Sequence, residues 1–546
     1  MFNDDGPLDG ARPTAEELVS EHTERLPKRG LKPTDIRVDR RIFEVADNTD
    51  AALCRAGEIY QRAGALCRIG TIPAGMVHGV FREEPSPGII GFDTPGLGDW
   101  ASRVASFVKW DGRKQDFREV DPPAEVMRAL LSRRGIWGFP PLAGFTSSPT
   151  IRPDGSILDT PGFDAKTGLF AHFLKSSFPS IPSHPTKDQA SAALTLLCEI
   201  FKEFPYTSDA GRSVALSAVL TALIRQSLAA APIHAFTAPR PRTGKSKQPR
   251  IASLIATGRL PATTSQAEDE AEFEKRLLGI LLSGTPVISI DNIFRPLSSP
   301  SLCSVITEGE FSSRVLGSTN LTRVPTAITL CATGNNLAVT GDLNDRTVVS
   351  EIDPQCERPE EREFEQGDLE GEVRNRRHIL AVAGLTIIKA YLDAGAPDVG
   401  IRQWGGFEGY TTWIRSPLVW LGMADPRESR SYLESRDPVK TGLGNLLTAW
   451  REAVGGGGRT VAEILDMATR RQYSPEKREE VWTHPNLREA VGELCATAGK
   501  DFNSRRLGIF IRNHQNRIEN GLAFKTSGLD HSGVLRWYVV NTKEKA

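Results

Sequence analysis

The chain has 546 residues, which is too long for one ordinary domain and predicts about three or four folded units. Its 67 basic and 68 acidic side chains leave a net charge of −1, so any nucleic-acid site has to be a local patch and not a field over the whole protein. The seven cysteines are scattered and form no C-x-x-C pair, which argues against a zinc ribbon or a disulfide framework and predicts a reducing cytosol.

The sequence gives no sign of secretion or of membrane insertion. The N-terminal stretch MFNDDGPLDGARPTAEEL is acidic and polar, unlike a signal peptide. The longest apolar run, residues 379–388, is too short to span a bilayer. We therefore expect a soluble cytoplasmic protein with no membrane partner.

Residues 1–145 are predicted to form an accessory α+β region with helices at residues 50–65 and 123–134. Residues 146–230 begin with PTIRPDGSILDTPGF, where Pro-Asp-Gly between two β-prone runs predicts a hairpin. An alanine- and leucine-rich stretch at residues 186–231 then has helical spacing, interrupted at Phe204 and Pro205.

Residues 231–370 alternate strand and helix patterns. Residues 233–258 have a strand–loop–helix pattern, and apolar runs at residues 287–290 and 326–332 are each followed by acidic or amide residues, which is typical of buried parallel strands in an open α/β sheet that binds nucleotide. Residues 371–455 are predicted to be helical. Four glycines at residues 455–458 then form a hinge before a compact unit at residues 456–546.

The segment FTAPRPRTGKS, which ends at Ser246, finishes as a phosphate-binding loop does. The full pattern is G-x-x-x-x-G-K-[ST] between a strand and a helix. In this sequence Pro239 stands at the position of the first glycine. In a working loop the residues from Arg242 through Thr243 and Gly244 cradle the phosphates with backbone N–H groups. Lys245 contacts the β- and γ-phosphates, and Ser246 binds Mg²⁺. The alternative is a chance Gly-Lys-Ser in a basic loop.

The departures from the pattern bear on activity. Arg242 stands where a second glycine is common, and a positive φ there costs a non-glycine residue about 1–2 kcal/mol. Pro249 costs about 3 kcal/mol in a helix unless it lies in the first turn. Arg240, Lys247 and Arg250 add positive charge that would attract phosphate. The loop thus predicts ATP binding and leaves efficient hydrolysis open.

The strand VISIDN is predicted to hold the Mg²⁺ shell with Asp291 at its end. Many ATPases of this kind carry glutamate at the next position, where Asn292 stands. An amide can orient a water molecule but cannot accept its proton. The alternative is a buried strand that ends in a turn aspartate.

ATGNN ends the next predicted strand, where Asn335 would bond the γ-phosphate or the attacking water. The alternative is a simple turn. Arg346 is our candidate for an arginine that reaches a neighbouring subunit's γ-phosphate, a contribution of about 10³–10⁵ in rate. Arg314 and Arg323 are further candidates, and the competing interpretation is a surface arginine paired with Asp345.

The C-terminal unit carries a basic amphipathic helix followed by a β-hairpin, which suggests a winged helix that binds nucleic acid. Residues 496–546 hold nine Lys or Arg against four Asp or Glu. The predicted contacts are Arg505, Arg506, Arg512 and Arg517. A solvated helix face or a protein-docking wing is the alternative.

In chain order, these segments resemble a family of phage- and prophage-encoded AAA+ ATPases related to superfamily III helicases, which occur in primase and replication proteins of mobile elements. The resemblance covers about residues 60–437 and rests on an ordered set of segments. They begin at Pro149, Gly162, Ala238, Ile290, Arg314, Ala332, Gly341, Arg358 and Trp420.

The resemblance implies an α/β fold with a P-loop AAA+ core, and a ring-forming, hexameric DNA helicase or translocase that acts in the replication of a phage or other mobile element. ATP and Mg²⁺ would lie between Lys245 of one subunit and Arg346 of the next. Single-stranded or forked DNA and replication proteins would be its partners. Relatives usually carry glycine at the position of Arg242 and an aliphatic pair at Lys247 and Gln248, whereas Asn292 is the family's own residue.

Two alternatives stay open. The first is a catalytically weak or inactive AAA+ scaffold that binds DNA. The second is an AAA+ remodeller or loader that acts on protein in plasmid control or phage defence.

Overall fold

The computed structural model describes residues 34–77, 79–113, 116–314, 321–359, 367–474, 478–495 and 502–542. The chain divides into two compact units. The first comprises Met1–Leu337 and Arg346–Arg430, and the second comprises Ala338–Asp345 and Ser431–Ala546. Within the described ranges, no helix is long and apolar enough to cross a membrane.

The N-terminal part of the first unit has a small core of its own. β1 (Thr34–Arg37) pairs in parallel with β7 (Ala105–Asp111), and β8 (Asp116–Val120) completes the sheet. α2 (Ile42–Ala56), α3 (Thr94–Val104) and α4 (Ala124–Ser132) pack on it around Phe107 and Leu53. The predicted helix at residues 123–134 is confirmed. The one at residues 50–65 is wrong in extent, because Gly57 (φ 77°) ends α2 and Tyr60 starts a strand.

Short strands connect this part to the central sheet. β2 (Tyr60–Arg62), β3 (Ala65–Ile72) and β6 (Ser86–Gly91) form one sheet, and β9 (Gly144–Thr146), β13 (Leu169–Ala171) and β12 (Gly162–Asp164) form another. The hairpin expected at Pro-Asp-Gly is present as β10 (Thr150–Ile151) and β11 (Ile157–Leu158).

The central sheet has seven strands in the order β20-β14-β19-β16-β15-β5-β4. Five of them are mutually parallel: β14 (Ile233–Ala238), β15 (Ala262–Ser265), β16 (Val287–Ile293), β19 (Thr329–Asn335) and β20 (Thr347–Glu351). β5 (Val80–Arg82) adds antiparallel to β15, and β4 (Gly75–Val77) pairs with β5. The expected α/β class with a parallel sheet is therefore confirmed.

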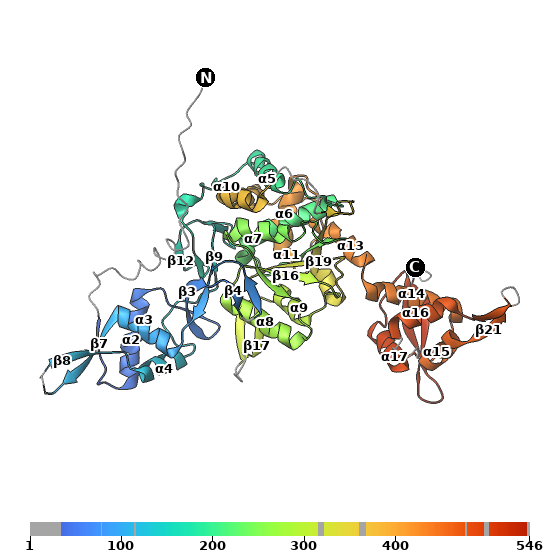
Figure 1. Ribbon diagram of the computed structural model, residues 1–546, viewed down its shortest axis with the longest axis horizontal. Coiled ribbons are helices and arrows are strands. Elements are labelled where there is room, and N and C mark those ends of the chain that lie inside the picture. The colour runs from blue at the N-terminus through green and yellow to red at the C-terminus, as the bar shows by residue number, and fades with distance from the viewer. Residues whose placement is uncertain are drawn as a thin grey trace, which may run out of the picture. The chain divides into compact units, whose positions relative to one another are not determined.

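Helices lie on both faces of this sheet (Figure 1). One face carries α5 (Lys187–Ile200), α6 (Asp209–Ile224), α7 (Lys247–Thr257) and α10 (Leu369–Asp393), and the other carries α8 (Glu270–Ser283) and α9 (Pro300–Thr307). All six residues of β14 are buried, as expected for a strand covered on both faces, and the one imidazole among them, His234, lies 3.2 Å from the Ser217 hydroxyl. The hairpin β17 (Glu310–Arg314) and β18 (Leu321–Pro325) lies between β16 and β19 in the chain.

The second unit combines helices with two hairpins. The helices are α14 (Pro438–Val454), α15 (Val461–Thr469), α16 (Pro485–Cys495) and α17 (Ser504–Asn513). The hairpins pair β21 (Arg471–Ser474) with β22 (Glu479–Trp482), and β23 (Leu522–Leu529) with β24 (Leu535–Asn541). Trp450, Leu507, Ile511 and Phe524 are buried together in its core.

Candidate nucleotide and nucleic-acid sites

The segment Pro239 to Ser246 leaves the carboxyl end of β14. β14 lies between β19 and β20. The crossover from β14 leads past β19 toward β15, whereas the one from β19 leads past β14 to β20, so the crossovers of these two neighbouring strands run in opposite directions. In open α/β sheets, ligands bind outside the carboxyl ends of the strands at such a switch point. The segment is followed directly by α7, which gives the strand–loop–helix order that a phosphate-binding loop needs.

The backbone of this loop is strained at Arg242, whereas Pro249 is accommodated without strain. Arg242 has φ 60° and Gly244 has φ 93°. An arginine in the left-handed region costs about 1–2 kcal/mol, so the loop keeps a glycine-like turn without the glycine. Pro249 is the third residue of α7 and lies in its first turn, where proline is tolerated.

The N–H groups of this loop form a run of unused donors. Those of Thr243, Gly244, Lys245 and Ser246 make no hydrogen bond to any described residue. The first bonds of the turn come later, from Lys247 N–H to the Gly244 carbonyl oxygen at 2.9 Å. Consecutive free N–H groups at a helix N-terminus favour an anion. The buried hydroxyl of Thr243 also has no partner among the described residues.

Lys245 and Asp291 act on each other electrostatically. Lys245 is half-buried and makes no ion pair with a described residue. Burial lowers the pKa of the Lys245 amine, and the negative charge of Asp291 acts in the opposite direction. A half-desolvated amine without a close counter-ion is suited to bind a negatively charged ligand.

Asp291 is held in place from the neighbouring strand. The Thr333 hydroxyl on β19 donates a hydrogen bond to Oδ1 of Asp291 and accepts one from the Asn292 N–H at 3.3 Å. The register between β16 and β19 shifts between Ile290 and Ile293, and Asn292 adopts φ 56°. This bulge leaves Asn292 exposed beside the carboxylate. The sequence analysis did not single out Thr333, although it lies in the ATGNN segment.

Asn335 is brought to the same edge of the sheet. It lies opposite Ala238 in the parallel register of β14 and β19, and it is exposed. The next residue ties the two strand ends together, because Asn336 N–H donates to the Ala238 carbonyl oxygen at 3.0 Å. The structure therefore gathers Lys245, Asp291 and Asn335 from three separate segments.

The side chain of Gln248, two residues after the loop, anchors the start of α7 by hydrogen bonds that the sequence analysis did not predict. It is buried, and its Oε1 accepts from the Ser350 hydroxyl at 3.0 Å and from the Tyr206 hydroxyl at 3.3 Å. Phe204 lies against the loop, with a ring carbon 3.6 Å from where a Cβ on Gly244 would be. No local sequence signal marks these contacts, because the partners lie about 40 and 100 residues away in the chain.

The prediction that Arg250 adds free positive charge around the loop is wrong. Its guanidinium is bonded to both Glu83 and Glu370, with Nε–Oε1 at 2.7 Å to Glu370 and Nη1–Oε1 at 2.5 Å to Glu83. Arg240 donates to the Glu357 carbonyl oxygen at 3.0 Å. The charge of Arg250 is thus neutralised by carboxylates that are distant in sequence.

Arg346 lies far from the loop of its own chain. It immediately precedes β20, and Thr347 pairs with Ile233, the first residue of β14. The loop leaves the other end of β14, five residues or about 16 Å further along the sheet. Arg323 lies on the β17–β18 hairpin opposite Ser312, and the side chain of Arg314 lies outside the described residues.

In the second unit, α17 presents an exposed basic face. Arg505, Arg506, Ile509 and Arg512 are exposed, whereas Leu507 and Ile511 are buried on the opposite side. Arg517, which follows the helix, is also exposed. None of the four arginines has a side-chain hydrogen bond or ion pair with a described residue.

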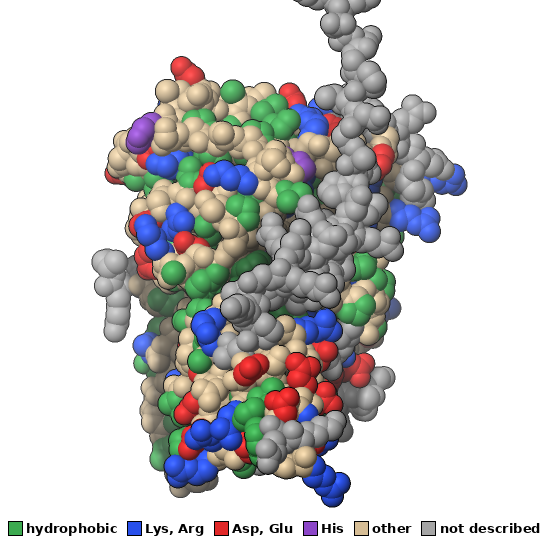
Figure 2. All heavy atoms as spheres, turned by 90° about the vertical axis from the view of Figure 1, so that its left-hand side faces the viewer, with side chains coloured by type: hydrophobic (Ala, Val, Ile, Leu, Met, Phe, Trp, Pro, Cys, Tyr) green, Lys and Arg blue, Asp and Glu red, His purple; other side chains and the backbone are tan. Residues whose placement is uncertain are grey.

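The position of these arginines on the helix is informative. Arg505 and Arg506 lie in the first turn of α17, where positive charge opposes the helix dipole by about 0.3–1 kcal/mol each. Helix stability therefore does not explain them. By contrast, basic and acidic side chains are interspersed on the face of the molecule seen in Figure 2.

Comparisons with known proteins give weak similarities only. No protein-family model and no curated protein matches the chain. Among solved structures, it is similar to the apo form of the NrS-1 C-terminal region, with a TM-score of 0.33 and 11% identity over 71% of this chain and 76% of that one. It is also similar to JCV helicase, with a TM-score of 0.19 and 10% identity over 46% of this chain and 73% of that one.

Proposed function

We propose that the first unit is a P-loop ATPase of the AAA+ type that binds Mg²⁺ and ATP at the end of β14. The observation that carries the proposal is the run of four N–H groups at residues 243–246 without partners, beside the half-buried amine of Lys245. Together they offer a triphosphate a cradle of backbone donors and one positive charge.

The other residues of the site fit a bound Mg²⁺–nucleotide. Oδ2 of Asp291 and the hydroxyl of Ser246 have no partners among the described residues. Mg²⁺ is usually held by one or two such oxygens together with phosphate oxygens and water. Asn335 would orient the attacking water or the terminal phosphate, and Asn292 would face the same water as an amide.

We further propose that the protein acts as a ring on DNA, as a helicase or translocase in the replication of a phage or other mobile element. In a ring, Arg346 would serve the neighbouring subunit, and its distance from its own loop supports that assignment. The exposed arginines of α17 would contact phosphates, and the second unit would then bind as a winged helix.

Asn292 favours a second candidate function. An exposed amide next to Asp291 cannot take a proton from water, so a scaffold that binds ATP and DNA without turnover is the competing proposal. The two proposals share the nucleotide site and differ only in hydrolysis.

Steady-state ATP hydrolysis by the full chain, with and without single-stranded DNA, separates the two. The motor proposal expects turnover that DNA stimulates and that Lys245→Ala abolishes. If the wild-type protein binds nucleotide without turnover, the motor proposal fails and the scaffold proposal is supported. Absence of nucleotide binding would remove both.

A further inference from the structure

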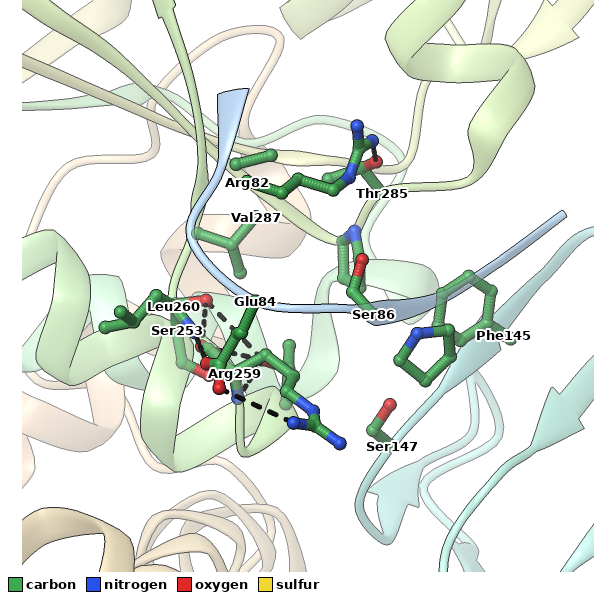
Figure 3. Close-up of a pocket in the computed structure, with 14 residues that line it drawn as sticks. Arg82, Glu84, Ser86, Phe145, Ser147, Ser253, Arg259, Leu260, Thr285 and Val287 are labelled. Atoms are coloured by element: carbon green, nitrogen blue, oxygen red, sulfur yellow. Dashed lines mark hydrogen bonds and ion pairs between the residues drawn. The ribbon is translucent and has the colours of Figure 1, made fainter. Parts of the chain in front are cut away.

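A second polar cavity lies at the edge of the central sheet opposite the phosphate-binding loop. Its wall includes Ala262 and Val287, the first residues of β15 and β16, whereas the loop follows the last residue of β14. The cavity has about 410 Å³ of empty space, including the solvent at its mouth. Figure 3 shows the polar side chains around it, which come from the segment between the end of β5 and the start of β6, from the residue after β9, from α7 and the residues that follow it, and from the residues before β16.

Arg82 is a buried cation in this wall without an anionic partner. Only 6% of its surface is exposed. Its Nη2 donates to the Thr285 hydroxyl at 2.8 Å and reaches the Ser283 hydroxyl at 3.5 Å, and both of these partners are neutral. Its Nε and Nη1 have no partner among the described residues. Burial without a counter-charge is unfavourable and lowers the pKa of the Arg82 guanidinium.

The neighbouring charges do not compensate Arg82. Glu84 accepts from Arg374 Nη2 at 3.0 Å and lies 3.5 Å from Arg259 Nη1, so two cations share this carboxylate. Arg377 lies next to the cavity residue Ser147 and is half-buried, and within the described part of the chain it donates only to carbonyl oxygens, those of Ser147 and Ala256. Its Nε is buried without a partner among the described residues.

A purely structural explanation accounts for part of this charge. Arg374 also donates to the Gly258 carbonyl oxygen at 3.3 Å, and so caps the C-terminal end of α7, which carries about half a negative charge. The ion pairs of Arg250 with Glu83 and Glu370 adjoin this region and can be added to the count. The described residues then comprise five guanidinium groups and three carboxylates. These are Arg82, Arg250, Arg259, Arg374 and Arg377, with Glu83, Glu84 and Glu370. Counted over the described residues alone, more than one positive charge stays unbalanced near a cavity that hydroxyl groups line.

We propose that this cavity binds a small oxyanion, namely the phosphate group of inorganic phosphate or of a phosphate monoester. Arg82 and Arg259 supply the charge, and a guanidinium fork matches the spacing of phosphate oxygens. The hydroxyls of Ser86, Ser147 and Thr285 line the same space as donors (Figure 3). The ligand would join the β5 segment to the C-terminal end of α7, the helix whose other end begins at the phosphate-binding loop.

The test uses the full chain with Lys245→Ala, so that binding at the phosphate-binding loop is weakened from the outset. Thermal unfolding is followed while phosphate replaces chloride at constant ionic strength. We expect a saturable rise in Tm, and at least tenfold weaker apparent affinity in Arg82→Met and in Arg259→Gln. Arg276→Gln, which loses an arginine paired with Glu272 on α8, serves as the matched control and should respond like its parent.

Each outcome decides the proposal. A phosphate effect that persists in Arg259→Gln, or a Lys245→Ala parent that phosphate does not stabilise more than chloride, overturns it. If Arg82→Met does not fold, the phosphate affinities of Arg259→Gln and Ser147→Ala are compared with that of the parent instead. Glycerol phosphate replaces inorganic phosphate in a second series, and tighter binding there identifies a monoester as the ligand. Because Lys245 is absent throughout, failure of the ATPase proposal leaves this result unaffected.

Discussion

Thr333 on β19 donates a hydrogen bond to the carboxylate of Asp291 on β16, and this contact fixes the orientation of the acidic group at the candidate nucleotide site. Only Oδ1 is used, and Oδ2 has no partner among the described residues. Thr333 also bonds the N–H of Asn292 and thereby holds the bulge that separates Asp291 from Ile293. One hydroxyl therefore positions both residues that would face a metal-bound water.

Thr333→Val should remove this support while keeping the shape of the side chain. A hydrogen bond to a charged group is worth about 1.5–3 kcal/mol, so we expect a loss of that order in unfolding free energy and about tenfold weaker Mg²⁺-dependent nucleotide binding. Urea unfolding and nucleotide titration at fixed Mg²⁺ measure the two effects.

Thr329→Val is the matched control. Thr329 is also buried on β19, but its hydroxyl has no partner among the described residues. Its replacement should leave stability unchanged or slightly higher. Equal losses in the two variants would show that Thr333 has no special role.

Lys245 predicts a defined pH dependence. Burial lowers its pKa in the folded protein below that in the unfolded chain. Between these two pKa values the unfolded chain binds more protons, so stability rises with pH in that alkaline window. At neutral pH the amine is charged in both states, and the burial penalty is fully present.

Lys245→Met should therefore stabilise the nucleotide-free protein at pH 7, and its advantage should shrink as the pH rises toward 10.5. Urea unfolding at a series of pH values gives the difference directly. An advantage that grows with pH would contradict the assignment. Lys440→Met, which removes a partly exposed amine near Glu434 in the second unit, is measured over the same pH series as the control.

Sequence patterns predicted the sheet and the edge at which its polar residues meet. Carboxyl ends of parallel strands share one edge, so Asp291 and Asn335 could be placed together from strand periodicity alone. The contacts that position them could not be predicted. Gln248 bonds Ser350, and Arg250 bonds Glu83, across about 100 residues or more of chain, and no local pattern encodes such pairs. The helix expected at residues 50–65 failed because Gly57 takes a positive φ and pairing with β3 determines the next segment.

Arg242 offers a test of backbone strain in the loop. Its φ of 60° is accessible to glycine and poorly accessible to a β-branched residue. Arg242→Gly should raise stability by about 1–2 kcal/mol relative to Arg242→Ala, and Arg242→Val should be less stable than both. Chemical unfolding ranks the three variants. The order Gly, Ala, Val in decreasing stability is expected, and equal stability of Ala and Val would show that the turn relaxes on substitution.

Arg346 should act on the neighbouring subunit and not on its own. Lys245→Ala and Arg346→Ala are each expected to abolish turnover alone. In a ring assembled from equal amounts of the two variants, about one quarter of the interfaces carry both intact residues, so partial activity should return. Hydrolysis is measured as the mixing ratio changes, with subunit stoichiometry determined in parallel. If the mixture assembles into rings but stays inactive, Arg346 does not act at the nucleotide site of the neighbouring subunit.

The basic face of α17 should determine how DNA binding depends on salt. Each phosphate contact contributes about 0.7–0.9 to the slope of log K against log salt concentration, so neutralising Arg505, Arg506 and Arg512 together should lower that slope by about 2–3. Fluorescence anisotropy with labelled single-stranded and duplex DNA, repeated at several salt concentrations, measures it. Arg470→Gln is the matched control, because Arg470 is exposed in the same unit but paired with Asp466 at 2.7 Å. It should leave the slope unchanged. If both variants changed the slope alike, net charge and not the α17 face would control binding. If neither changed it, α17 would have to dock a protein instead.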